Sequence, residues 1–514
     1  MKFQKPFALI SVLSLSLFAS AVQKSAKLTL TVAAPGAAAS DLSISVNGKA
    51  ATATPTTPIK NMVVPDLKLD QYTTELPEQV ANPMIFVFDA MDTKEIEDRD
   101  MRKYVLKYMS AAAARKESVG LLVMYRDGVL TIHDYRAGSA VLTAALAQVN
   151  GGSAPPVPGA EQQIAIETRR LSAFAKGDYS TKAGDETLLL TTLESPIYMV
   201  QEVAAGLRDV PGRKAIVWIT AGVPFEIDER DHSLTSHQEM NNGASVNGVQ
   251  VQSTKRSATD DQIRKLQPMW RSALFNLWDS GTAVYPVEAL SPFSPPAGRV
   301  YTSTMNTFAQ MTGGRAFYGT NDPLPFFSSI ASDNANSASV TLSFEASSDN
   351  WQKLNVSSPK SSKVLAPSGI FAPPDLTPED ARKKAVGIAL NSRFGFAGVP
   401  FRLTLGEQTA NGSKKSVKFS VFVPPNAGVV NEKAGEISLE IAALAIGKKS
   451  EKAGVMGAGA GGKLPADALK QITEMGVNIS KTIDVPPGEY TLRVVVRDNL
   501  TGRIGSIEAY LKVE

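Results

Sequence analysis

The stretch FVFDAMDT, residues 86–93, carries the residue types most suited to chemistry in this chain. An apolar run ends at Asp89, and two more oxygen-bearing side chains, Asp92 and Thr93, follow closely. Oxygens at the mouth of a buried strand can ligate a hard cation such as Mg²⁺, work as an acid/base pair, or present a binding surface. Asp92 or Thr93 can also simply cap the helix that is predicted to follow.

A second candidate is the polar segment DERDHSLTSHQEM, which holds two of the three histidines, His232 and His237. Four acidic residues accompany them: Asp228, Glu229, Asp231 and Glu239. Such a set can gather Zn²⁺ or Ca²⁺, but H-E-x-x-H is absent and no predicted helix fixes the spacing. A solvated surface loop is the favoured interpretation. The third histidine, His133, is interpreted as a structural residue of an edge strand.

Other catalytic motifs are absent or incomplete. GAGAGGKL at 457–464 matches G-x-x-x-x-G-K but has Leu464 in place of the Mg²⁺-binding Ser or Thr, so a flexible loop between strands is predicted there. No G-x-S-x-G nucleophile elbow occurs, and the chain has no cysteine. Gly313 and Gly314 are expected to end a helix and turn the chain into a short strand over 314–319.

The elements that must position Asp89 alternate between apolar runs and helical periods. Buried strands are predicted at 84–89, 118–125, 215–220 and 282–290, and helices at 94–116, 139–149, 186–209, 261–280 and 301–312. A hairpin at Asp127-Gly128 adds an antiparallel edge strand over 128–135. Continuous apolar strands separated by helices indicate an α/β fold, with a Rossmann-like, doubly wound, mostly parallel sheet. Long inserts at 150–185 and 222–260 are expected to frame its carboxyl edge.

The remaining segments suggest five parts: a signal peptide at 1–21, a short β segment and linker at 22–81, the α/β domain at 82–335, a β extension with a connecting helix at 336–397, and an all-β, sandwich-like domain at 398–514. Within the fourth part, Thr377 and Pro378 begin a helix that runs to about 390.

The N-terminus has the features of a secretory signal peptide. Lys2 and Lys5 precede the apolar run FALISVLSLSLF at 7–18, and the small residues ASA at 19–21 fit a cleavage site. The run is too short for a membrane anchor, and no later stretch reaches spanning length. Removal of both lysines takes Lys+Arg from 53 to 51 against 50 Asp+Glu, a net charge near +1. That balance gives no reason to expect nucleic acid as a partner.

Several stretches together resemble a known family: PMIFVFDAMDT, DVPGRKAIVWITAGVPF, TAVYPVEAL, MTGGRAFYGTND and PPGEYTLRVVVRDNLTGRIGS. Their order and spacing are similar to the acidobacterial VWFA-related exported proteins over roughly residues 82–514. The resemblance implies a von Willebrand factor A-type domain followed by a β-rich part. Such domains usually bind protein partners, often through a divalent ion held at the carboxyl ends of the strands.

The ion-binding pattern of that family is degraded in this chain. Carried over by residue, Asp89 and Thr93 keep their oxygens, but a thioether stands at Met91 and Ala221 offers no ligand atom. The remaining position falls at or near Arg136, which is cationic. We therefore expect no bound metal, with Mg²⁺ or Ca²⁺ as the weaker alternative. Arg136 either pairs with Asp89 or Asp92 as a built-in cation or points to solvent.

These observations predict an exported, non-enzymatic protein that binds a protein or peptide through the rim formed by Asp89, Asp92, Thr93, Arg136 and Ala221. In this prediction the carboxylates accept from a basic group and Thr93 donates its hydroxyl. Two alternatives stay open. One is an exported hydrolase that uses the rim carboxylates or the His232/His237 loop, and the other is a structural component of the cell envelope.

Overall fold

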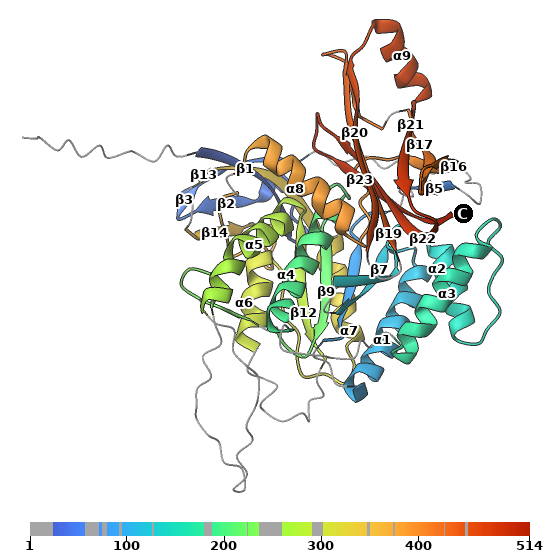
Figure 1. Cartoon of the computed structure of the whole chain (residues 1–514). Coiled ribbons are helices and arrows are strands. Elements are labelled where there is room, and N and C mark those ends of the chain that lie inside the picture. Colours follow the sequence, from blue (N-terminus) through green and yellow to red (C-terminus); the bar gives the residue numbers. More distant parts are fainter. Residues whose placement is uncertain are drawn as a thin grey trace, which may run out of the picture.

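The computed structural model describes residues 24–56, 71–74, 80–91, 95–125, 128–178, 188–223, 225–235, 260–289, 302–346, 350–373, 376–425, 427–447 and 451–514 (Figure 1). The expected signal peptide, Asp92, Thr93 and His237 lie outside the described residues.

A five-stranded mixed sheet forms the centre of the α/β region (Figure 1). Its strands lie in the order β12 (Thr282–Glu288), β9 (Lys214–Thr220), β6 (Met84–Asp89), β7 (Val119–Tyr125) and β8 (Gly128–His133). The first four are parallel and β8 is antiparallel to β7. Every residue of β6 and β9 is buried. The four strands predicted from apolar runs and the antiparallel edge are therefore confirmed.

Helices cover both faces of this sheet because its strands are apolar on both sides. Phe86 and Phe88 of β6 share one core with α1 (Glu95–Ala114), α2 (Ser139–Val149), α3 (Glu161–Lys176) and α7 (Leu324–Ala335). Ile85 and Val87 point the other way, into a core with α4 (Leu188–Leu207), α5 (Asp260–Asp279) and α6 (Thr302–Thr312). This alternation with period two follows from strand geometry.

Two of these helices lie where none was predicted. Helix α3 occupies the insert at 150–185, and Ile164, Leu171 and Phe174 on one of its faces are buried. The insert begins with the Gly/Pro-rich stretch NGGSAPPVPG, which favoured a loop, so the helical periodicity that follows was not recognised. The helix α7 follows the predicted strand at 314–319, which is reduced to a single bridge between Phe317 and Val287. The insert at 222–260 begins with a two-stranded hairpin, β10 (Glu226–Ile227) and β11 (Leu234–Thr235).

The N-terminal strands pair with strands that follow the α/β region. β1 (Lys24–Ala33) and β4 (Thr52–Pro55) flank β13 (Ser337–Ala346). β2 (Ser43–Val46) pairs with β3 (Lys49–Ala50) and β14 (Gln352–Ser357), and β14 also pairs with β15 (Gly369–Ile370). A short helical turn, η1 (Ala39–Asp41), links β1 to β2. Segments from opposite ends of the α/β region thus pair in two small sheets.

Helix α8 (Pro378–Asn391) connects this part to the C-terminal region. It begins as predicted: the Thr377 side chain accepts from the Asp380 amide, 3.1 Å between Oγ1 and N, and Pro378 takes the first turn.

The C-terminal region contains two β-sheets that share one apolar core. One sheet has the order β21 (Val477–Val485), β17 (Lys414–Val423), β16 (Arg402–Asn411) and β5 (Gln71–Thr73). The other has β18 (Val430–Asn431), β19 (Glu436–Gly447), β22 (Gly488–Asp498) and β23 (Ile504–Val513), with β20 (Lys452–Lys463) paired to β19. Helix α9 (Ala466–Met475) joins β20 to β21. The loop predicted at 457–464 is wrong, because these glycines and alanines belong to β20.

Candidate functional site

The carboxyl edge of the central sheet places Asp89 beside Thr220. Asp89 is the last residue of β6, and the pairing of β6 with β9 brings the two strand ends side by side. The Asp89 side chain is fully buried. One carboxylate oxygen accepts from the Met91 amide at 3.1 Å. The other accepts from the Trp218 indole at 3.3 Å and from the Thr220 hydroxyl at 2.9 Å.

Strand periodicity explains why these donors meet the carboxylate. Trp218 and Thr220 alternate along β9 and therefore project to the same face of the sheet, which is also the face of Ile85 and Val87. Asp89 continues that face of β6. Sequence reasoning missed both donors because it looked for metal ligands after β9, at Ala221. The signal that could have found them is the alternation in the run VWIT, which places Trp218 and Thr220 on one face of the strand.

This arrangement changes the expected role of Asp89. A carboxylate that accepts three hydrogen bonds from its own chain inside the protein is a structural acceptor. The expectation that Asp89 accepts from a basic group of the partner is therefore wrong, because its oxygens are enclosed. Met91 and Ala221 do lie beside it, each partly exposed, at the ends of β6 and β9.

Hydrogen-bond donors surround the Asp89 carboxylate where a metal ion would need further oxygen ligands. Mg²⁺ needs oxygen ligands in near-octahedral array, and each Asp89 oxygen already receives an N–H or O–H donor. Within the described ranges, no group of three His, Cys, Asp or Glu side chains is placed to hold an ion. The residues beside Asp89 that the structure describes do not fit a divalent cation.

The prediction that Arg136 lies on this rim is wrong. In the strand register, Asp89 of β6 stands beside Met124 near the end of β7. Strand β8 runs back along β7 and pairs His133 with Leu121, near the start of β7. Arg136 follows His133 and so lies beyond the opposite edge of the sheet. An antiparallel strand delivers its end to the other edge, which the sequence comparison did not take into account.

Arg136 instead bridges the α/β and C-terminal regions. Its guanidinium pairs with Asp134 at 2.7 Å and donates to the carbonyls of Phe396 and Ser506 at 3.4 and 3.1 Å. Burial by itself would raise the pKa of Asp134, but the Arg136 charge and hydrogen bonds hold it below its ordinary value. Neither pairing with Asp89 nor exposure to solvent describes this residue.

In the described part of the histidine segment, 228–235, the side chains make contacts other than the metal ligation considered from the sequence. The His232 ring stacks on Trp351, with ring centroids 4.0 Å apart, and burial lowers its pKa. Asp228 pairs with Arg230, and Asp231 accepts from Ser233. His232 therefore packs the loop against Trp351, the residue before β14. His133 forms a buried pair with Glu167 of α3, 3.1 Å between Nδ1 and Oε2, which supports its structural interpretation.

A cavity of about 300 Å³ lies between α4, α5 and α8, next to the C-terminal region. It opens beside the sheet edge opposite Asp89, where α4 and α5 lead into β9 and β12. The space exists because small side chains line α4 and α8: Ala204, Ala205, Ala381 and Ala385. Phe396 and Ile504 close it from the C-terminal region. Sequence reasoning missed this site, because its lining comes from segments nearly three hundred residues apart.

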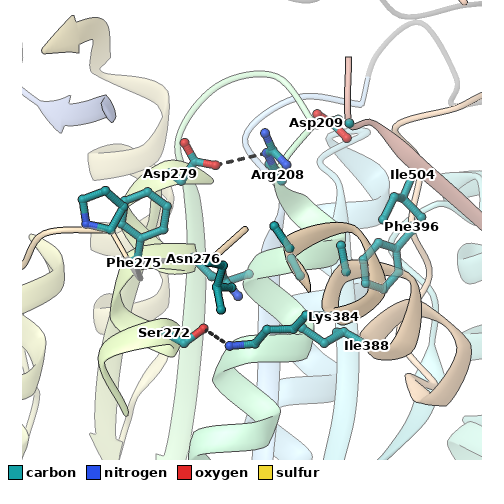
Figure 2. Close-up of a pocket in the computed structure, with 17 residues that line it drawn as sticks. Arg208, Asp209, Ser272, Phe275, Asn276, Asp279, Lys384, Ile388, Phe396 and Ile504 are labelled. Carbon is teal, nitrogen blue, oxygen red and sulfur yellow. Dashed lines mark hydrogen bonds and ion pairs between the residues drawn. The ribbon is translucent and has the colours of Figure 1, made fainter. Parts of the chain in front are cut away.

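The polar groups of the cavity come from α5, from α8 and from the end of α4 (Figure 2). At one end, the Lys384 amine donates to the Ser272 hydroxyl at 2.8 Å. At the other end, Arg208 pairs with Asp279 at 3.1 Å. The Asn276 side chain stands between them (Figure 2). Burial raises the pKa of Asp209, which lines the same end as Arg208.

No protein-family model matches the chain, and no curated protein matches it. Three solved structures illustrate the likenesses found. Proximal thread matrix protein 1 from the mussel byssus has 10% identity and a TM-score of 0.25, covering 50% of this chain and 48% of its own. A mutant of the PilB minor pilin from Streptococcus sanguinis has 13% identity and a TM-score of 0.27, covering 49% and 61%. The pilus adhesin SpaC from Lactobacillus rhamnosus GG has 10% identity and a TM-score of 0.29, covering 92% and 56%.

The chain spans about half the length of the mussel and adhesin structures that it matches. Likenesses at these TM-scores assign neither a fold nor a function. In the part of the chain that the structure describes, no helix is both long and apolar enough to cross a membrane.

Proposed function

We propose that the protein is an exported, non-catalytic binding protein whose α/β region is of the von Willebrand factor A type. The carboxyl-edge rim, defined here as the surface around Met91 and Ala221 above Asp89, contacts a protein partner without a bound metal. The support for the fold type is the strand order with an antiparallel edge hairpin, as the family resemblance implies. In open α/β sheets the ligand crevice lies beyond the carboxyl ends of the strands.

One observation carries the non-catalytic part of the proposal. Asp89 is fully buried and its carboxylate accepts from Met91, Trp218 and Thr220. A general base or nucleophile must reach its substrate, and a metal ligand must be reachable by the ion. Asp89 is enclosed by the chain and instead holds the rim backbone through the Met91 amide. Binding then depends on the shape of the rim surface, to which Met91 and Ala221 contribute partly exposed side chains.

The test is crosslinking of the mature chain in an envelope preparation, followed by identification of the captured protein. Ala221→Arg places a bulky cation on the rim and should abolish capture of that protein. Ala140→Arg is the matched control, since Ala140 is exposed at the start of α2, beyond the opposite edge of the sheet. Capture should persist in a chelator.

Three results would contradict the proposal. If Ala221→Arg leaves capture unaffected, the rim is not the contact surface. If a chelator abolishes capture, binding depends on a metal ion. If the unmodified chain turns over a hydrolase substrate and the Ala221→Arg variant does not, the rim belongs to an enzyme. Before capture is compared, circular dichroism must show that both variants fold.

A further inference from the structure

We infer that the cavity between α4, α5 and α8 is a binding site for a small organic monoanion, a carboxylate carried on an apolar body. The site is separate from the rim, since it opens beside the opposite edge of the sheet. The inference therefore goes beyond the proposed function and does not depend on it.

The Lys384 end of the cavity supplies the donors that such an anion needs. Among the described residues, no carboxylate lies within ion-pair distance of the Lys384 amine, whose hydrogen-bond partner is the Ser272 hydroxyl. Since one ammonium carries three N–H groups, further donors remain available. Burial lowers the pKa of Lys384, and no charged neighbour opposes that effect.

Ser272 adds a further donor at the same place. Its oxygen accepts from Lys384 at 2.8 Å and from Gln201 Nε2 at 3.3 Å. With both bonds accepted, the hydroxyl hydrogen of Ser272 is left to donate. Ser272 and Gln201 are each only 4% exposed, so the oxygen is fixed in position. Asn276 lies one helical turn further along α5 and faces the same cavity (Figure 2).

The charges favour a monoanion over a dianion. Arg208 and Asp279 neutralise each other as an ion pair, which leaves Lys384 as a cation with no carboxylate counter-ion among the described residues. Asp209 lines the far end, where it offers no positive charge to pair with a second anionic group. A single lysine also lacks the paired donor geometry that favours phosphate. A carboxylate matches this distribution.

The size and lining of the cavity indicate the body of the ligand. A volume of about 300 Å³ is at the lower end for small-molecule sites. The length along α5 from Ser272 to Asp279 is roughly 10 Å at the rise of an α-helix. The walls between them are apolar and include Ala205, Ala385 and Phe396. A short apolar chain fits, with its carboxylate at Lys384.

The experiment is calorimetric titration of the full chain with butyrate, hexanoate and octanoate, each paired with its neutral amide. Binding should favour the carboxylate over the amide and strengthen with chain length. Lys384→Met keeps the aliphatic stem and removes the charge, and should weaken hexanoate binding about tenfold or more. Lys383→Met is the matched control, because Lys383 is the neighbouring lysine on α8, its side chain 66% exposed. Ala385→Leu fills the cavity and should abolish binding.

Equal binding of hexanoate and hexanamide would overturn the inference, as would unchanged affinity in the Lys384→Met variant or no binding of any of the carboxylates. A thermal melt of each variant shows that it is folded before its titration is interpreted. Ala221→Arg should bind hexanoate as the unmodified chain does. Failure of partner capture and failure of carboxylate binding can therefore be told apart.

Discussion

The sequence predicts Asp89 as an acceptor for a basic group, whereas the structure shows it as a buried acceptor for its own chain. If it is a structural acceptor, Asp89→Ala leaves the buried Trp218 indole N–H and the Met91 amide without their acceptor. The Thr220 hydroxyl can still donate to the Gly222 carbonyl at 2.8 Å. Each group left without its acceptor costs about 1–3 kcal/mol. We expect the free energy of unfolding to fall by about 2–5 kcal/mol in urea titrations. Asp100→Ala is the control, since Asp100 is exposed on α1. Equal stability of both variants would contradict the structural role.

Lys214 gives a second prediction at this scale. It is the buried first residue of β9 and donates to the Ser280 carbonyl at 2.6 Å. Burial lowers its pKa to about 7, although Asp209 and Asp279 act in the opposite direction. In the unfolded chain an ordinary lysine titrates near pH ~10.4. Between these values the unfolded state binds more protons, so this residue makes the free energy of unfolding rise with pH.

The slope that one such group contributes is at most about 1.4 kcal/mol per pH unit. Urea titrations at about pH 7 and about pH 9 should show a smaller rise for Lys214→Met than for the unmodified chain. Lys353→Met, at an exposed position on β14, should leave the rise unchanged. If both variants keep the same pH dependence as the unmodified chain, Lys214 is not the titrating group.

At the scale of elements, the turn after α6 limits what residue can stand at Gly314. A Cβ added there would be 2.0 Å from the Val284 carbonyl oxygen of β12, which is backbone and has little freedom to move. Gly313 before it has φ +80, which ends α6 as predicted. The close approach positions α6 against the sheet, so the pair of glycines serves packing as well as turning.

Gly314→Ala should therefore destabilise the chain by about 2 kcal/mol or more, because the helix or the strand must shift. Gly387 is the matched comparison: it lies inside α8, and an added Cβ there meets nothing within 4 Å. Gly387→Ala should stabilise by up to ~1 kcal/mol through helix propensity. Thermal and urea unfolding of the two variants should give opposite signs, and the same sign for both would contradict this account.

For the whole molecule, Arg136 forms a polar bridge between the α/β and C-terminal regions. Arg136→Met removes the bonds to the Phe396 and Ser506 carbonyls and leaves Asp134 without its cation. We expect a loss of about 2–4 kcal/mol and separate calorimetric transitions for the two regions. Arg170→Met, at an exposed position on α3, is the control. An unchanged single transition for Arg136→Met would show that the regions are coupled by other contacts.

The sequence by itself determined the local elements. Apolar runs located β6, β7, β9 and β12 to within a few residues, and the Thr377-Pro378 pair located the start of α8. These signals are local, since strand burial and helix capping depend on neighbours in the chain. They also singled out Asp89 and Ala221 as neighbours at one edge of the sheet, because parallel strands end at the same edge.

The tertiary structure alone decided what those residues meet. The direction of β8 placed Arg136 at the far edge, and the two side-chain donors to Asp89 came from β9, some 130 residues away. The pairing of β1 with β13 and the cavity lined by Lys384 likewise depend on segments that are distant in the sequence. Such contacts depend on how distant faces pack, and the free energy of packing is set by shapes and directions that no local pattern encodes.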